Sequence, residues 1–319
     1  MAEPAHALVL VALGGNTLLR PGQPASYEAQ AETLRNSQAV VVELIRRGCR
    51  VIITHGNGPQ VGHILLRVEA ARGQAYELPL DACVAQSQGE MGYLIQQCLE
   101  NLLQREGLER PVATLLTRTV VEKRDPRMQH PTKPVGPRYT RGHAAAMEQR
   151  GYHVAPEPSG GFRRVVPSPW PLRIVEEEAI RRLIEREIIV IAAGGGGIPV
   201  HVEGDGTLTG VEAVVDKDLA SAVLAVELGV ERIVNLTAVE HAKLRFNTPE
   251  EQDLTRLTIA EAERYLKEGH FAPGSMGPKV ESAIWFLERG GRDFIITTPE
   301  RAIDALEGKT GTHIFLDGR

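Results

Sequence analysis

Cysteine, aromatic residues and long apolar runs are all scarce in this 319-residue sequence. Its three cysteines, Cys49, Cys83 and Cys98, are far apart and lack the CxxC or CxxH spacing of a zinc site. An odd number of widely spaced thiols also gives no disulfide framework. We therefore assign no metal ligands from the sequence, and we expect a reducing, cytoplasmic environment.

The sequence also lacks a basic excess: its net charge is -5, and Lys and Arg form no run. Nucleic acids and anionic membrane surfaces bind basic faces, so neither is an expected partner. The apolar stretch at residues 7–13 is too short to cross a bilayer and ends in Gly14 and Gly15. It is typical of a buried strand.

Lysine is scarce as well, with 7 among the 36 basic residues. Because arginine occupies most cationic positions, each lysine is a candidate for a role that needs a compact ammonium group. Drift in composition is the alternative. The seven are Lys123, Lys133, Lys217, Lys243, Lys267, Lys279 and Lys309.

Short β-branched runs alternate with longer segments of helical spacing. The predicted strands are residues 7–13, 50–54, 112–116, 188–193, 232–236 and 293–297. The predicted helices are residues 30–47, 174–187 and 217–228. Continuous apolar strands separated by helices favour an α/β fold with a mainly parallel sheet that helices cover on both faces.

Residues 122–167 interrupt this alternation with seven of the twenty prolines and little periodicity. Such composition is poor material for a sheet interior, and a segment of this length is seldom structureless in a compact domain. We interpret it as an inserted subdomain or lid. A long ordered surface loop is the alternative.

Three predicted strands run directly into glycine, at residues 14–16, 56–58 and 194–197. Ligands of parallel α/β sheets bind beyond the carboxyl ends of strands, where glycine lets backbone N–H groups approach an anion. Asn16 and Asn57 add side-chain amides that can orient a ligand oxygen. The pattern favours a phosphate-binding site.

Common nucleotide-binding motifs do not fit. In a dinucleotide-binding fingerprint the third glycine would come one residue before Gly62, so that motif is out of register. A P-loop that contained Lys309 would need its first glycine at the position of Ile303. We expect Lys309 to be a solvated surface residue. His55 has no second ligand at metal spacing, and orienting a loop is a more common role than catalysis for a histidine at a strand end.

Three lysines lie in motifs with a restricted backbone. Lys133 stands between two prolines, Lys217 lies between Asp216 and Asp218 at a predicted helix start, and Lys279 follows a glycine-containing loop. For Lys217, a surface ion pair is the alternative. Fixed cations beside phosphates are what in-line phosphoryl transfer needs.

At these residues the sequence resembles the carbamate kinases of the amino acid kinase family. The matching segments, in family order, are VALGGN at 11–16, HGNGPQVG at 55–62, QG at 88–89 with GY at 92–93, PTKPVGP at 131–137, VVPSP at 165–169, GGGGIPV at 194–200, GVEAVVDKD at 210–218, GHFAPGSM at 269–276 and PK at 278–279.

The resemblance implies one domain over residues 1–319, a three-layer αβα sandwich, with residues 122–167 protruding. Residues up to about 200 would bind carbamate or carbamoyl phosphate, and the remainder ATP or ADP with Mg²⁺; the protein would be a homodimer. The implied substrate-binding residues are Gly14, Gly15, Asn16, Gly56, Asn57 and Gly58. The implied nucleotide-binding residues are Lys217, Thr237, Val239, Gly274, Ser275, Met276 and Lys279.

The implied catalytic residues are Lys133, Lys217, Asp218 and Lys279, with Asp218 orienting the lysines. Lys243 departs from the resemblance, because an aromatic or apolar residue is expected there, and Phe246 is the candidate to stack on adenine instead. Two alternatives remain: a kinase of the same fold for another small carboxylate or phosphonate, and a non-catalytic binding protein.

Overall fold

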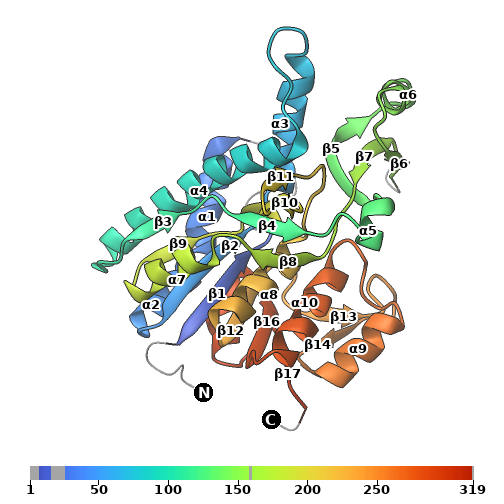
Figure 1. The fold of residues 1–319 in the computed structure, drawn as a ribbon. Coiled ribbons are helices and arrows are strands. Elements are labelled where there is room, and N and C mark those ends of the chain that lie inside the picture. The colour runs from blue at the N-terminus through green and yellow to red at the C-terminus, as the bar shows by residue number, and fades with distance from the viewer. Residues whose placement is uncertain (1–6, 16–25, 158–159, 318–319) are drawn as a thin grey trace.

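An eight-stranded sheet forms the centre of the computed structural model, which describes residues 7–15, 26–157 and 160–317 (Figure 1). The strand order is β15-β17-β16-β12-β1-β2-β9-β3, and every neighbouring pair is parallel except β16 and β17. The bounds are β1 Leu8–Leu13, β2 Arg50–His55, β3 Val112–Thr114, β9 Ile189–Ile191, β12 Arg232–Leu236, β15 Arg256–Thr258, β16 Asp293–Thr297 and β17 Thr312–Phe315. The prediction of a mainly parallel sheet is confirmed.

Helices cover both faces of this sheet. One layer contains α7 Glu177–Glu185, α8 Lys217–Leu228, α9 Ile259–Lys267 and α10 Met276–Glu288. The other contains α1 Tyr27–Ser37, α2 Ala39–Arg46, α4 Leu80–Arg105 and α11 Ala302–Leu306. Alternate side chains of β1 enter the two cores: Leu10 faces α8, whereas Val11 faces the opposite layer.

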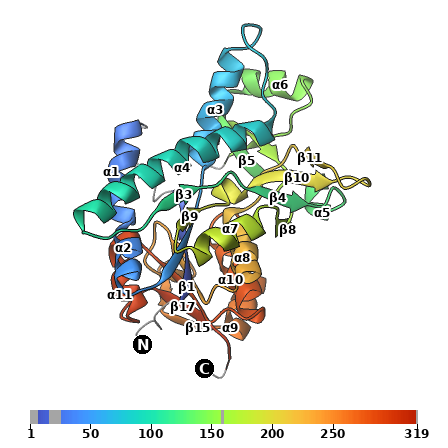
Figure 2. The ribbon, with the colours of Figure 1, turned by 60° about the vertical axis from the view of Figure 1, so that its left-hand side comes forward.

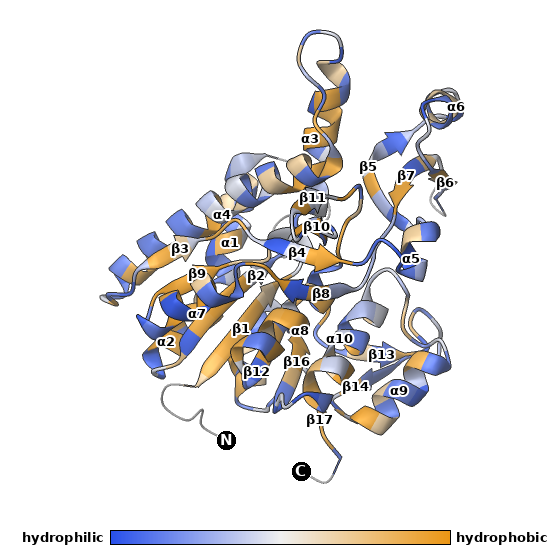
Figure 3. Ribbon diagram, in the orientation of Figure 1, coloured by the Kyte–Doolittle hydropathy of each residue, from blue (hydrophilic) through white to orange (hydrophobic). Residues whose placement is uncertain are grey.

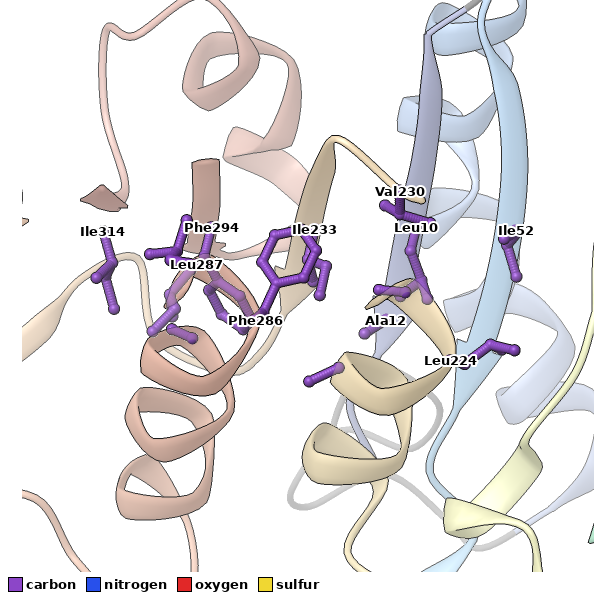
Figure 4. Close-up of a cluster of buried hydrophobic side chains, with 14 of the residues drawn as sticks. Leu10, Ala12, Ile52, Leu224, Val230, Ile233, Phe286, Leu287, Phe294 and Ile314 are labelled. Atoms are coloured by element: carbon purple, nitrogen blue, oxygen red, sulfur yellow. The ribbon is translucent and has the colours of Figure 1, made fainter. Parts of the chain in front are cut away.

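Both cores are apolar. Figure 3 shows the central strands as the most hydrophobic elements, with polar residues on the outer helices. Figure 4 shows Leu10 and Ile233 of the sheet beside Leu224 of α8 and Phe286 of α10, all four of them without solvent exposure. Burial on both faces explains why these strands are continuous apolar runs rather than alternating ones. The αβα sandwich is confirmed.

Besides a two-stranded pair described below, two smaller sheets accompany the central one. The first has the order β11-β10-β4-β8, and the second the order β5-β7-β6. The bounds are β4 Arg118–Val121, β5 Lys133–Tyr139, β6 Val154–Pro156, β7 Phe162–Val166, β8 Pro171–Ile174, β10 Ile198–Val202 and β11 Leu208–Gly210.

Residues 122–167 thus carry the β5-β7-β6 sheet together with α5 Pro126–Gln129 and α6 Arg141–Gln149. Figure 2 shows α6 and α3 Gly58–Ala70 rising above the central sheet. The remaining elements are β13 Ala242–Leu244, β14 Gln252–Leu254 and the short 3₁₀ turns η2 Gly194–Gly196 and η3 Pro299–Arg301.

The predicted helix bounds need two corrections. Residues 30–47 are two helices that meet at Gln38, whose buried side-chain amide donates to the Ile95 carbonyl oxygen at 2.8 Å. The helix predicted from residue 174 begins at Glu177, because Ile174 belongs to β8 and its backbone N–H donates to the Glu227 carboxylate. No helix of the described residues is both long and apolar enough to span a bilayer.

Candidate active site

The carboxyl ends of four parallel strands meet at one edge of the central sheet, and a cavity of about 310 Å³ lies there. Its lining residues are Gly14, Gly15, Gly56, Asn57, Gly58, Pro59, Val61, Lys133, Pro134, Val135, Gly195, Val214, Val215, Asp216, Lys217, Asp218, Thr237, Gly274, Ser275 and Lys279. We call this the reaction cavity. Five of the six predicted substrate-binding residues line it, and the sixth, Asn16, lies outside the described residues.

Glycine is required where the loops after β1 and β2 pack backbone against backbone. A Cβ on Gly56 would lie 3.0 Å from the Gly15 nitrogen, and one on Gly14 would lie 2.6 Å from the Leu236 carbonyl oxygen. Both contacts are with backbone atoms, which cannot move aside as a flexible side chain can. The two loops therefore hold their N–H groups at a fixed spacing beside the cavity.

Asn57 is oriented by two neighbours, of which one is glycine. Its side-chain nitrogen donates to Ser87 Oγ at 2.6 Å, and Ser87 is fully buried on α4. Gly195 lies against the same amide with φ +65°, and a Cβ there would be 1.9 Å from Asn57 Nδ2. The loop after β9 thus closes over Asn57 only because Gly195 has no side chain. Ser87 carries no local sequence signal that links it to Asn57.

Lys217 and Lys279 share one carboxylate. Lys217 Nζ donates to Asp218 Oδ1 at 2.7 Å, and Lys279 Nζ donates to Asp218 Oδ2 at 2.9 Å. Asn235, on β12, also donates to Oδ1 of Asp218, at 2.6 Å. The side chains of the two lysines are only 11% and 9% exposed, so the surface ion pair considered for Lys217 is wrong.

Two helices bring the charged residues of this cluster together. Lys217 and Asp218 begin α8, Lys279 lies in the first turn of α10, and these two helices pack against each other on the same face of the sheet. Both helix N-termini therefore lie at the cavity, and the positive ends of the two helix dipoles favour an anion there.

Opposing effects determine the charge states within the cluster. Burial by itself would raise the pKa of Asp218, but the two ammonium groups and the Asn235 amide outweigh burial and hold that pKa well below its usual range. Burial lowers the pKa of Lys217, and the Asp218 carboxylate only partly offsets this effect. Asp218 is therefore an anion that keeps two buried cations in place.

Lys133 reaches the same cavity from the three-stranded sheet of residues 122–167. Its Nζ donates to Asp216 Oδ2 at 2.6 Å, and the other oxygen of Asp216 accepts the Asp218 backbone N–H at 2.9 Å as the N-cap of α8. One carboxylate thus caps the helix and holds the lysine. Three ammonium groups and two carboxylates meet at this edge of the sheet, which leaves positive charge in excess.

A second cavity, of about 450 Å³, adjoins the first and shares Thr237, Ser275 and Lys279 with it. It contains the other predicted nucleotide-binding residues, Val239 and Met276. Gly274 and Lys217, in contrast, line the reaction cavity. All seven predicted nucleotide-binding residues therefore lie along this pair of cavities.

Lys243 also lines the second cavity, as does Phe246, whose side chain is half exposed. Lys243 Nζ lies 2.5 Å from Glu251 Oε1 and 3.2 Å from Asp253 Oδ1, across the β13–β14 pair. These ion pairs give a structural reason for a lysine at position 243, which the sequence resemblance does not explain. Lys243 stabilises the hairpin that forms one wall of the second cavity.

His55 is placed beneath the cavity rather than in its lining. Burial lowers its pKa to about 4, and its Nδ1 lies 2.9 Å from the Gly56 carbonyl oxygen. A Cβ on Gly194 would lie 2.4 Å from His55 Nε2. The geometry agrees with a role in supporting the glycine loops. Lys309 is exposed and pairs with Glu307, as expected for a surface residue.

The fold and the lysine cluster are those of a phosphotransferase family, and comparison with known proteins identifies it. The profile of the Amino acid kinase family matches residues 7–298, and the chain belongs to this family. Carbamate kinase from Pyrococcus furiosus is 49% identical, over 96% of this chain and 98% of its own. Carbamate kinase from Thermococcus kodakarensis is 47% identical, over 97% and 99%.

A solved structure agrees with these sequences. Carbamate kinase from Giardia lamblia bound to AMP-PNP is 39% identical and has a TM-score of 0.92, over 98% of this chain and 99% of its own. The similarity therefore includes all of the elements that form the two cavities.

Proposed function

We propose that this protein is a carbamate kinase, which transfers a phosphoryl group reversibly between ATP and carbamate. The observation that carries the proposal is the convergence of Lys133, Lys217 and Lys279 on two carboxylates where two cavities adjoin. Fixed positive charge at that boundary would stabilise the charge that spreads over the transferring group in the transition state. The full-length similarity to carbamate kinases supports the same substrates.

In this proposal the reaction cavity holds carbamate or carbamoyl phosphate, and the second cavity holds the nucleoside. In the ATP-forming direction, a β-phosphate oxygen of ADP attacks the phosphorus of carbamoyl phosphate, the P–O bond to the carbamoyl oxygen breaks, and carbamate leaves. Carbamate then decomposes to ammonia and CO₂. The nucleophile is an anion in either direction, the ADP phosphate when ATP forms and carbamate in the reverse reaction, so no general base is required. The protein contributes positioning and charge neutralisation.

Each lysine has a distinct position in this scheme. Lys279 lines both cavities, so we assign it to the transferring phosphoryl group. Lys217, at the start of α8, neutralises the same group or the nucleotide phosphates, and Asp218 orients both lysines. Lys133 approaches from the protruding sheet and contacts the carbamoyl phosphate side. The division near residue 200 and the inserted character of residues 122–167 remain predictions.

Magnesium fits this site as a companion of the nucleotide. Among the described residues no group of three or more His, Cys, Asp and Glu could hold a metal ion, and both oxygens of Asp218 are engaged by cations or amides. Both oxygens of Asp216, the other carboxylate of the reaction cavity, are engaged too, by Lys133 and by the Asp218 backbone N–H. Mg²⁺ commonly binds through substrate phosphates, so the phosphates of the nucleotide and of carbamoyl phosphate would supply its ligands here. Bound Mg²⁺ would neutralise phosphate charge during transfer.

The decisive experiment measures ATP formation from ADP, Mg²⁺ and carbamoyl phosphate, coupled to hexokinase and glucose-6-phosphate dehydrogenase. We expect turnover far above the spontaneous decomposition of carbamoyl phosphate. Folded protein with no turnover above that background would exclude the kinase and leave a binding protein. Turnover with acetyl phosphate at least equal to that with carbamoyl phosphate would instead favour another small-carboxylate kinase.

Two further expectations rest on the sequence. We propose that the protein is a homodimer, which light scattering coupled to size exclusion tests directly. We also propose that it works in the cytoplasm, where its three buried cysteine thiols would stay reduced.

A further inference from the structure

A third cavity, of about 490 Å³, lies at the opposite end of the central sheet from the lysine cluster. Arg232, the first residue of β12, and Arg292, directly before β16, border it where these two parallel strands begin. Arg256 of β15, which runs in the opposite direction, also borders it. The reaction cavity, in contrast, includes Thr237, which follows the last residue of β12. The length of a strand separates the two sites. We call this third site the arginine cavity.

The arginine cavity carries positive charge in excess within an acidic chain. Three guanidinium groups line it, and Asp293 is the one carboxylate among its lining residues within the described chain. Asp293 is already engaged, because its Oδ2 lies 3.0 Å from Arg232 Nε and its Oδ1 lies 3.4 Å from His313 Nδ1. Arg256 and Arg292 therefore provide the excess positive charge of the arginine cavity.

Arg256 is held in place without being neutralised. Its guanidinium carbon lies 4.5 Å from the centre of the Phe315 ring, and within the described residues no carboxylate is at ion-pair distance from it. Among the described residues, the carboxylate neighbour of Arg292 lies at the limit of that distance, with 3.9 Å between Arg292 Nη1 and Glu231 Oε2. Stacking fixes the plane of a guanidinium group while its N–H edge stays available to an anion.

We propose that the arginine cavity binds a small phosphate-bearing anion, either inorganic or an organic phosphate ester. Two positive charges in excess match a phosphate dianion, and arginine pairs bind phosphate oxygens through two parallel hydrogen bonds. The volume exceeds that of the reaction cavity, and Leu306 and Phe315 give it an apolar wall that could take an organic group. This inference does not depend on the proposed kinase function.

The test is calorimetric titration with pyrophosphate in a buffer free of phosphate and Mg²⁺. The wild-type chain and the Arg256→Gln/Arg292→Gln double variant share the reaction cavity, so its contribution is common to both. We expect one binding event fewer in the double variant than in the wild type, or an affinity at the arginine cavity that is reduced at least tenfold. Arg289→Gln, which removes an exposed arginine stacked on Trp285 of α10, is the matched control and should bind as the wild type does.

Further titrations identify the source of the phosphate. Ribose 5-phosphate binding more tightly than inorganic phosphate would support an organic ester, and the reverse order would support the inorganic ion. Identical pyrophosphate isotherms for the wild type and the double variant would overturn the proposal. If the double variant does not fold, Arg256→Lys replaces it, with binding several-fold weaker expected and unchanged binding refuting the site.

Discussion

Replacing Lys133 by alanine tests the proposed mechanism with the smallest disturbance to the fold. In the wild type this lysine contributes one ammonium group to the reaction cavity, and its side chain is 30% exposed. Removing one preorganised donor to a developing charge typically costs about 2.7–4 kcal/mol. At about 1.4 kcal/mol per factor of ten, we expect kcat/KM for carbamoyl phosphate to fall by at least about a hundredfold.

The stability of the same variant should change little. The Lys133–Asp216 ion pair opens onto the cavity, and such pairs contribute about 0–1 kcal/mol. Asp216 keeps the Asp218 N–H as a donor, so it is not left unpaired. The melting temperature should therefore fall by no more than about 2 °C. Both quantities come from the coupled ATP assay and a thermal melt of the same preparation.

Lys123→Ala is the matched control. Lys123 also lies in the 122–167 segment and makes an ion pair, with Nζ 2.6 Å from Glu203 Oε1, but it is 49% exposed and does not line the reaction cavity. We expect its kcat/KM to equal that of the wild type. If Lys133→Ala kept more than half of the wild-type kcat/KM, Lys133 would have no part in catalysis. If it lost activity together with 10 °C of melting temperature, its role would be structural.

Three other substitutions give independent tests. Asp218→Asn leaves two buried ammonium groups without their shared anion, so urea titration should show about 3–5 kcal/mol lost from the free energy of unfolding, and a loss below 1 kcal/mol would contradict this. Gly195→Ala should lower both melting temperature and kcat/KM, because its Cβ would collide with Asn57, whereas Gly204→Ala, in open space, should change neither. Burial raises the pKa of Glu227 to about 7, so its folded state keeps a proton that the unfolded state releases, and stability falls as the pH rises from about 4.5 to 7. Glu227→Gln should therefore show a smaller change in melting temperature between pH 5 and pH 8 than the wild type, and an equal change would remove Glu227 as the cause.

The sequence predicts six of the eight strands of the central sheet, because these are apolar runs buried on both faces, and it misses β15 and β17 at one side of the sheet. β12 and β16 have the predicted bounds, and β1 begins one residue later than predicted. β8 and β11 were not predicted, because they are short, carry exposed polar residues and belong to a smaller sheet. Local composition distinguishes such strands poorly from loops.

Within the site, local motifs identified the glycines and lysines but not the side chains that orient them. Ser87 and Asn235 come to Asn57 and Asp218 through contacts that depend on the packing of distant elements. The break at Gln38 likewise depends on the Ile95 carbonyl, 57 residues further along the chain. The sequence indicates Asp216 only as a neighbour of Lys217. In the fold, the Asp216 carboxylate also accepts a hydrogen bond from Lys133, which lies on β5.

The lysine cluster has a consequence for the stability of the whole molecule. Lys217 and Lys279 share Asp218, so one of the two buried cations has no anion of its own within the cluster. Under the proposed function, a substrate phosphate would supply the missing negative charge. A phosphate-bearing ligand that binds only the folded chain shifts the folding equilibrium by mass action, increasingly so as its concentration exceeds its Kd. Substrate supply would then set the working lifetime of this protein as well as its rate of turnover.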